Sequence, residues 1–197
     1  MSRTPHLSPD RPRARSRLLA AVVAAGLIGT LGCGDDPFAI RWVEAPDTVL
    51  LYSLVRPEQN LFSGFSFINR VPVRIESPAA TGTWDVVVDT RGGEIVLLPP
   101  GALGVDSKAR ITTMPGMTFE EVIEAPEDTL LYTAEQVPMT LGTVYVVKTS
   151  QYQGSFGTRC SNYAKLEPLI IDPVGGTLTF VYDASPVCND RRLIPPD

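Results

Sequence analysis

The feature that most limits the fold is the spacing of prolines and glycines, of which the 197-residue chain has 18 and 16. Proline interrupts helices and central strands, and glycine marks turns, so the segments between them are short. No long stretch repeats apolar residues at helical spacing. The pattern predicts an all-β, strand-dominated, sandwich-like domain with one or two short helical turns.

Runs of β-branched, aromatic and alternating residues between these breaks predict the strands. TWDVVVD (83–89) and EIVLL (94–98) flank an Arg-Gly-Gly turn, which is typical of a β-hairpin. TFEEVIEAP (118–126) predicts a helical turn, because Thr118 and Glu121 have capping-box spacing and Pro126 can end it. Further strands are predicted at 47–55, 61–68, 71–76, 109–113, 141–149, 162–171 and 177–183, with a long loop at 151–162.

Cys160 and Cys188 flank the last predicted hairpin. The turn centre near Val174 is fourteen residues from each cysteine, so two paired arms would bring the thiols together at the open end. In an exported protein this arrangement predicts a disulfide. The alternative is a pair of buried free thiols.

The N-terminus has the charge pattern of an export signal. Five arginines and one aspartate lie within residues 1–17, and fourteen uncharged residues follow, from Leu18 to Leu31. A bilayer-spanning helix needs about 20 apolar residues, so this run fits the short apolar region of a signal peptide better than a membrane span.

The residues that end this run, GTLGC (29–33), resemble the lipobox of bacterial lipoproteins, with Thr30 where the best examples have leucine. The resemblance implies a signal peptide over 1–32 and a fatty acyl group such as palmitate on Cys33. The residues that remain have the length of one domain, and we expect a polar tether over 33–41 and a single β-rich domain over 42–197. The lipobox resemblance also implies the cell envelope. In enterobacterial lipoproteins an aspartate directly after the cysteine can retain the protein at the inner membrane. Here that residue is Gly34 and the aspartates begin at position 35, so the outer membrane is favoured over the inner. The alternatives are an ordinary cleaved signal with a chance cysteine and an uncleaved helical anchor.

Charge narrows the functions open to the mature chain. Removing residues 1–32 reduces 17 basic residues to 12 and 22 acidic residues to 21, which gives a formal net charge of −9. A nucleic-acid partner is not expected, because phosphate contacts need clustered Lys and Arg. The only histidine, His6, leaves with the signal. Its loss removes Ser-His-Asp and Cys-His catalysis and most zinc sites.

The acidic cluster over 120–128 predicts solvated surface, not a catalytic carboxylate pair. We therefore expect a non-enzymatic binding or interaction module without a metal site. Its partner would be an unknown protein or small molecule, and its membrane contact would be the N-terminal lipid. Tyr152 and Phe156, in the Gly-containing 151–162 segment, are candidates for lining a ligand groove; the alternative is that they pack against the core.

Five short segments resemble HmuY-like haem-binding lipoproteins in their order along the chain. They are WDVVVD (84–89), FEEVIEAPEDT (119–129), VYVVKT (144–149), YAKL (163–166) and LTFVY (178–182). The resemblance implies a mostly β fold and, as an alternative function, a carrier of haem or another small hydrophobic ligand. Iron ligands in that family are histidines or methionines, so Met114 and Met117 become candidate ligands; otherwise they are apolar fillers.

Two stretches of the chain are alike. WVEAPDTVLLYS (42–53) and VIEAPEDTLLYT (122–133) align without gaps. Either an internal duplication or two chance strand entries would produce this likeness.

Overall fold

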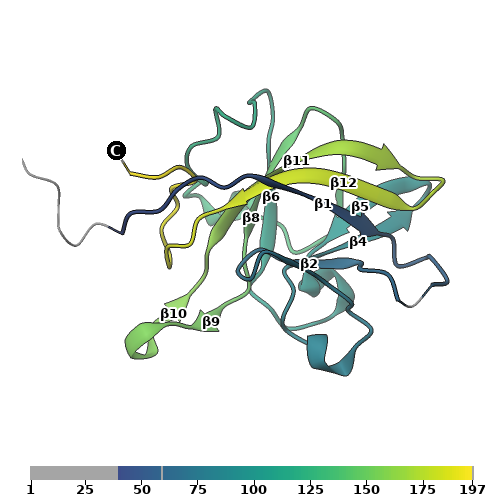
Figure 1. Cartoon of the computed structure of the whole chain (residues 1–197), viewed down its shortest axis with the longest axis horizontal. Coiled ribbons are helices and arrows are strands. Elements are labelled where there is room, and N and C mark those ends of the chain that lie inside the picture. The colour runs from purple at the N-terminus through teal and green to yellow at the C-terminus, as the bar shows by residue number, and fades with distance from the viewer. Residues whose placement is uncertain (1–39, 59, 197) are drawn as a thin grey trace, which may run out of the picture. The chain divides into compact units, whose positions relative to one another are not determined.

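Two five-stranded antiparallel sheets pack across a shared apolar core in the computed structural model (Figure 1). The structure describes residues 40–58 and 60–196. The predicted signal peptide and Cys33 lie outside this range. Within it, strands dominate and the only helices are short 3-10 turns, which confirms the predicted all-β, sandwich-like class.

Sheet A is built around the last hairpin of the chain. Its strands in spatial order are β1 (Asp47–Tyr52), β12 (Thr177–Ala184), β11 (Tyr163–Asp172), β8 (Val144–Lys148) and β6 (Arg110–Met114). The register pairs Leu166 with Tyr182, and it shifts between Pro168 and Ile170, where β11 bulges.

Sheet B contains the predicted Gly-Gly hairpin. Its strands in spatial order are β3 (Val71–Val73), β2 (Gly64–Ser66), β4 (Val86–Arg91), β5 (Glu94–Leu98) and β7 (Val137–Pro138). Arg91 pairs with Glu94, and Gly92 and Gly93 have φ of 61° and 86°. Both turn residues are therefore left-handed, as a two-residue hairpin turn requires.

The remaining elements are small. They are the two-stranded ribbon β9 (Tyr152–Gln153) and β10 (Arg159–Cys160), and the 3-10 helices η2 (Pro78–Ala80), η3 (Pro100–Leu103), η4 (Thr129–Leu131) and η5 (Ser155–Gly157). The prediction of a loop at 151–162 is thus corrected to a short hairpin. Its two-residue strands are too brief for an alternating pattern to register in the sequence.

The main core fills the space between the sheets with alternate residues of the strands. Leu178, Phe180 and Tyr182 of β12 face inward and are at most 1% exposed. Phe65 of β2 packs edge-on against Phe67 at 4.9 Å and against Tyr182 at 4.7 Å between ring centroids. This aromatic cluster joins the two sheets, since burying such rings is among the largest apolar contributions to folding.

The outer face of sheet A is covered as well. Phe119, Val122 and Leu193, from the 114–134 segment and the C-terminal tail, pack on Val146 and Tyr163 of the sheet. Among residues 40–58 and 60–196, no helix is long and apolar enough to cross a bilayer.

The predicted helical turn at 118–126 forms its capping pair without a helix. Thr118 N–H donates to Glu121 Oε2 at 2.8 Å, and Val122 N–H donates to Thr118 O at 3.3 Å. The segment makes a single turn and then runs extended, because Val122 and Phe119 point onto sheet A.

The last hairpin is closed by a disulfide between Cys160 and Cys188, whose Cα atoms lie 5.1 Å apart. β11 begins three residues after Cys160 and β12 ends four residues before Cys188. The structure therefore confirms the predicted bridge and rules out the free-thiol alternative.

Asp85, in the Trp84-Asp85 pair that precedes β4, joins two distant backbone segments. Its Oδ2 accepts from Phe67 N–H and its Oδ1 accepts from Ser150 N–H, both at 2.8 Å. Burial raises the pKa of this carboxyl, and the N–H donors oppose that shift.

The two alike stretches fold differently. Leu51 of β1 is fully buried, whereas Leu130 and Leu131 lie in η4 and are exposed. The structure therefore does not repeat at these positions.

Candidate functional site

A groove of about 550 Å³ lies over the outer face of sheet A. Its floor is formed by β11 and β12, and its walls by the segment before β1, the 119–123 turn and the C-terminal tail. The lining residues are Glu44, Pro46, Phe119, Glu120, Ile123, Lys165, Glu167, Leu169, Val181, Asp183 and Ile194. The volume is in the range of small-molecule sites, and the apolar lining fits such a ligand.

Lys165 is a buried cation in the floor of the groove, only 2% exposed. Its Nζ donates to Phe119 O at 3.0 Å and to Val122 O at 3.2 Å, and lies 4.6 Å from the centre of the Phe119 ring. Glu44 Oε1 is 3.9 Å from the same nitrogen. Burial lowers the pKa of Lys165, and the charges of Glu44, Asp183 and Glu120 oppose this shift. The lysine thus ties the 119–122 turn to the sheet and so shapes one wall.

The polar side chains around the groove are mostly acidic. Glu44 and Glu120 are exposed at the rim, and Glu167 is half-buried. Among the described residues that line the groove, Lys165 is the only cation opposite these carboxylates and Asp183. The groove therefore favours a ligand with an apolar body and a cationic or hydrogen-bond-donating group.

Asp183 is held by a guanidinium from outside the groove. Arg70 Nη1 donates to Asp183 Oδ1 at 3.0 Å, and Nη2 donates to Ala45 O. Ala45 N–H donates to Asp183 Oδ2 at 3.2 Å, and the Arg70 guanidinium lies 5.0 Å from the Tyr182 ring centre. This set of contacts fixes the segment before β1, which supplies Glu44 and Pro46 to the groove wall.

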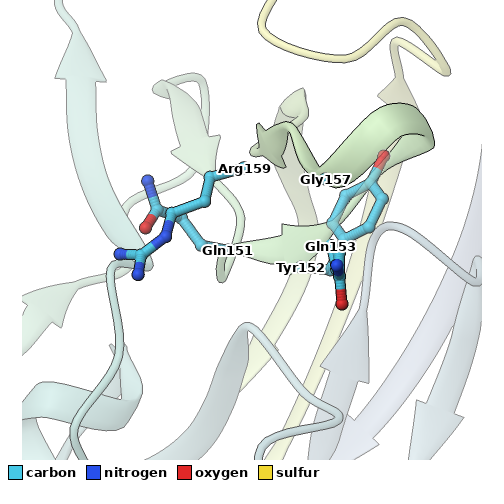
Figure 2. Close-up of a pocket in the computed structure, with 5 residues that line it drawn as sticks. All are labelled: Gln151, Tyr152, Gln153, Gly157 and Arg159. Atoms are coloured by element: carbon cyan, nitrogen blue, oxygen red, sulfur yellow. The ribbon is translucent and has the colours of Figure 1, made fainter.

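Two other hollows lie near the β9–β10 hairpin. One, of about 540 Å³, is lined by Gln151, Tyr152, Gln153, Gly157 and Arg159 (Figure 2). In Figure 2 the side chains of Gln151 and Arg159 lie together, and the ring of Tyr152 lies apart from them, beside Gln153. The second hollow, of about 320 Å³, places Trp42 and Val43 in one lining with Tyr152. The first is lined mainly by polar side chains and offers little apolar surface to a small molecule.

The predicted ligand residues fall in two separate places. Met114 and Met117 are half-buried and pack against the Phe119 cluster on sheet A. Tyr152 lines both hollows at the hairpin, and its hydroxyl donates to Asn162 Oδ1 at 2.8 Å. Phe156 sits at the hairpin tip in η5 and is fully exposed. The four residues therefore do not form one site.

Sequence reasoning missed the groove and its lysine. The available signal was Lys165 itself, a charged residue between apolar neighbours in YAKLEPL, at a strand position that a covered outer face would bury. Phe119 and Ile123 were hidden within a run that reads as acidic surface. No group of three or more His, Cys, Asp and Glu side chains in the described part of the chain is placed to hold a metal ion.

The chain matches no protein-family model, no curated protein and no solved structure.

Proposed function

We propose that this chain is a lipid-anchored protein of the cell envelope whose β-sandwich is a non-enzymatic binding module, with the groove over Lys165 as its ligand site. The observation that carries the proposal is the combination of an apolar lining, a buried ammonium and a carboxylate rim in one hollow of about 550 Å³. Apolar clefts with a few convergent polar groups are the usual form of small-molecule sites.

The charges of the groove specify the ligand class. Two N–H groups of Lys165 are used by backbone carbonyls and Glu44 lies near the third, so the lysine offers little to an anionic ligand. The carboxylates of Glu120 and Glu167 belong to the lining, and no arginine of residues 40–58 and 60–196 lines the groove with them. An amphipathic cation, with its apolar part on Phe119, Ile123 and Leu169, fits this arrangement.

The groove is tested by thermal shift with octyltrimethylammonium and octyl sulfate, both below their micelle concentrations. The cation is expected to raise Tm in proportion to its binding, and the anion is not, because only the state that binds ligand is stabilised. Equal shifts by both probes, or a shift by the anion alone, would contradict the proposed ligand class.

Ile123→Gln and Leu130→Gln form a matched pair for the same assay. Ile123 lines the groove and is 51% exposed, whereas Leu130 is exposed in η4 outside it. Ile123→Gln is expected to weaken cation binding by about tenfold, because the ligand loses roughly one apolar side chain to pack against. Leu130→Gln should bind as the wild type does. If the two variants change cation binding equally, the groove is not the binding site.

The anchor is tested separately, through Cys33, which lies outside the described residues. Cells fed a palmitate analogue are expected to label the wild type and not Cys33→Ser. Label retained at the N-terminus of the variant would overturn the lipoprotein part of the proposal.

The HmuY-like resemblance keeps a haem carrier as the second candidate. Met114 and Met117 pack against the same apolar cluster, so both thioethers lie on one face of sheet A. A Soret shift on adding haem, lost in Met114→Leu/Met117→Leu, would favour this function over the groove ligand. An unchanged Soret band on adding haem would exclude the haem-carrier function.

A further inference from the structure

The tip of the β9–β10 hairpin presents an apolar side chain to solvent from a strained backbone. Phe156 exposes its whole side chain. Its φ of 56° and ψ of 27° place it in the left-handed region, which is unfavourable for a bulky residue. Residues held in such sparsely populated backbone conformations concentrate at functional sites.

The hairpin is built to hold this tip in place. The Cys160–Cys188 disulfide fixes its base to the segment after β12. Gly154 packs against that bridge so closely that an added Cβ would clash with Cys160 Sγ. Gly154 N–H donates to Thr158 O at 2.8 Å across the tip, and Asn189 Nδ2 donates to Arg159 O at 3.0 Å. The hairpin extends away from the two sheets in Figure 1.

The start of the described chain lies beside this hairpin. Trp42, Val43 and Tyr152 line one hollow, so residues 42–43 adjoin the base of β9. Ile40 and Val43 are exposed apolar residues of this segment. In Figure 1 the first described residues and the hairpin lie toward the same end of the view, and the β11–β12 turn lies at the opposite end.

Cys33 is seven residues before Ile40, and a fully extended chain of that length spans at most about 25 Å. An acyl group on Cys33 would therefore keep this end of the domain close to the bilayer. We propose that the tip of the β9–β10 hairpin, with Phe156 at its apex, is a second contact with the bilayer to which Cys33 anchors the chain. This inference rests on the proposed lipid anchor.

The charge of the hairpin suits a phospholipid surface. The sequence has no aspartate or glutamate between Glu135 and Glu167, although the chain as a whole is acidic. Within the hairpin the only charged residue is Arg159, which is exposed. A hairpin with an apolar apex, one cation in its strands and no carboxylate is attracted to the boundary of an anionic bilayer, whereas carboxylates in the hairpin would be repelled.

The test places a tryptophan at the apex of the full chain. Phe156→Trp is reconstituted, lipidated, in vesicles of phosphatidylethanolamine and phosphatidylglycerol that contain brominated acyl chains. Emission beyond that of Trp42 and Trp84 in the wild type is assigned to the new residue. We expect this emission to shift to the blue and to be quenched by bromine.

Val174→Trp is the matched control, because Val174 is also fully exposed and lies in the β11–β12 turn at the other end of Figure 1. The fluorescence of the tryptophan at position 174 should keep its emission maximum at long wavelength and should be quenched by an aqueous quencher. Equal behaviour of the two tryptophans would overturn the inference. A tip that is reached by the aqueous quencher alone would overturn it too, and would leave a protein as the partner of Phe156.

Mass spectrometry of the N-terminal residue separates this test from that of the anchor. If Cys33 carries acyl groups and the tryptophan of Phe156→Trp is not quenched by bromine, the anchor stands and the hairpin contact fails. If Cys33 is unmodified, the lipoprotein proposal fails, and the same vesicles are added to the free protein. Absence of bromine quenching in Phe156→Trp then overturns the hairpin contact as well.

Discussion

Asp85 uses both carboxylate oxygens to hold separate backbone N–H groups, one from Phe67 and one from Ser150. An asparagine at this place can accept from only one of them, because its amide nitrogen would meet the other as donor against donor. We expect Asp85→Asn to lower the free energy of unfolding by about 2–3 kcal/mol, although it removes a buried charge. Urea unfolding measures this. A variant as stable as the wild type would show that the two N–H bonds contribute little.

The lowered pKa of Lys165 predicts that the free energy of unfolding depends on pH in the alkaline range. Its folded-state pKa is lowered from the ordinary value of 10.5, chiefly by burial. Between the lowered value and 10.5 the unfolded chain binds more protons at this residue, so the free energy of unfolding rises with pH in that window. The neutral amine still has two N–H groups for Phe119 O and Val122 O.

Lys165→Met isolates this effect. At neutral pH the variant leaves two buried carbonyls without their donor, and we expect a loss of about 2 kcal/mol. The difference in free energy of unfolding between wild type and variant should grow as pH approaches 10.5, since only the wild type gains from the titration. A difference that shrinks over this range would contradict the lowered pKa.

The left-handed backbone conformation of Phe156 costs free energy in the folded state. Asparagine tolerates this conformation better than most other side chains, so Phe156→Asn should lower that cost. Phe156→Asn should raise the free energy of unfolding by up to about 1 kcal/mol, and Phe156→Val should lower it. Thermal unfolding of the two variants makes the comparison. A destabilised Phe156→Asn would mean that the ring supports the fold.

At the level of elements, Arg70 connects the β2–β3 turn to β12 and to the segment before β1 through Asp183 and Ala45. Arg70→Met removes the guanidinium that donates to the buried carboxylate of Asp183 and leaves Lys165 as its nearby cation. Because Arg70 is partly exposed, we expect a loss of roughly 2 kcal/mol, less than for a fully buried pair. Trypsin should also cleave faster at Arg41. Arg74→Met, which removes a cation stacked on Phe62, is the control and should change stability little.

The disulfide ties β10 to the segment after β12 across a separation of 28 residues. Closing a loop of that size stabilises by about 3.5 kcal/mol on the chain-entropy account. Cys160→Ala/Cys188→Ala should lose roughly that amount in urea unfolding. Wild-type protein in strong reductant should match the double variant, and a mismatch would point to a packing effect of the alanines.

How far the sequence predicts these elements depends on their length. Alternation over β12, the Gly-Gly turn before it and the Gly-Gly turn before Glu94 are strong signals, so these two hairpins follow from pattern. The disulfide follows from the equal spacing of Cys160 and Cys188 from the turn between β11 and β12. β7, β9 and β10 have two residues each and carry no period. The groove depends on where the 119–123 turn and the tail settle on sheet A, which is decided by long-range contacts such as Lys165 with Phe119 O.

At the scale of the whole molecule, the two faces of sheet A have different partners. One face packs on sheet B through Phe180 and Tyr182, and the other is covered by irregular chain. Covering a sheet with loops held by a few polar contacts leaves gaps, and the groove is one of them. A ligand there would touch the segment before β1, the central hairpin and the tail together, so we expect ligand binding to slow proteolysis at both ends of the domain. Pulse proteolysis with and without octyltrimethylammonium measures this, and unchanged cleavage at either end would contradict it.

The β11–β12 hairpin is closed at one end by its turn and at the other by a covalent sulfur bridge, so its two strands belong to a ring. Val174, at the fully exposed turn, is the natural point for a protease to cut. A chain nicked there stays one molecule, with both strands still paired in the middle of sheet A. The cut becomes visible as two fragments only after reduction.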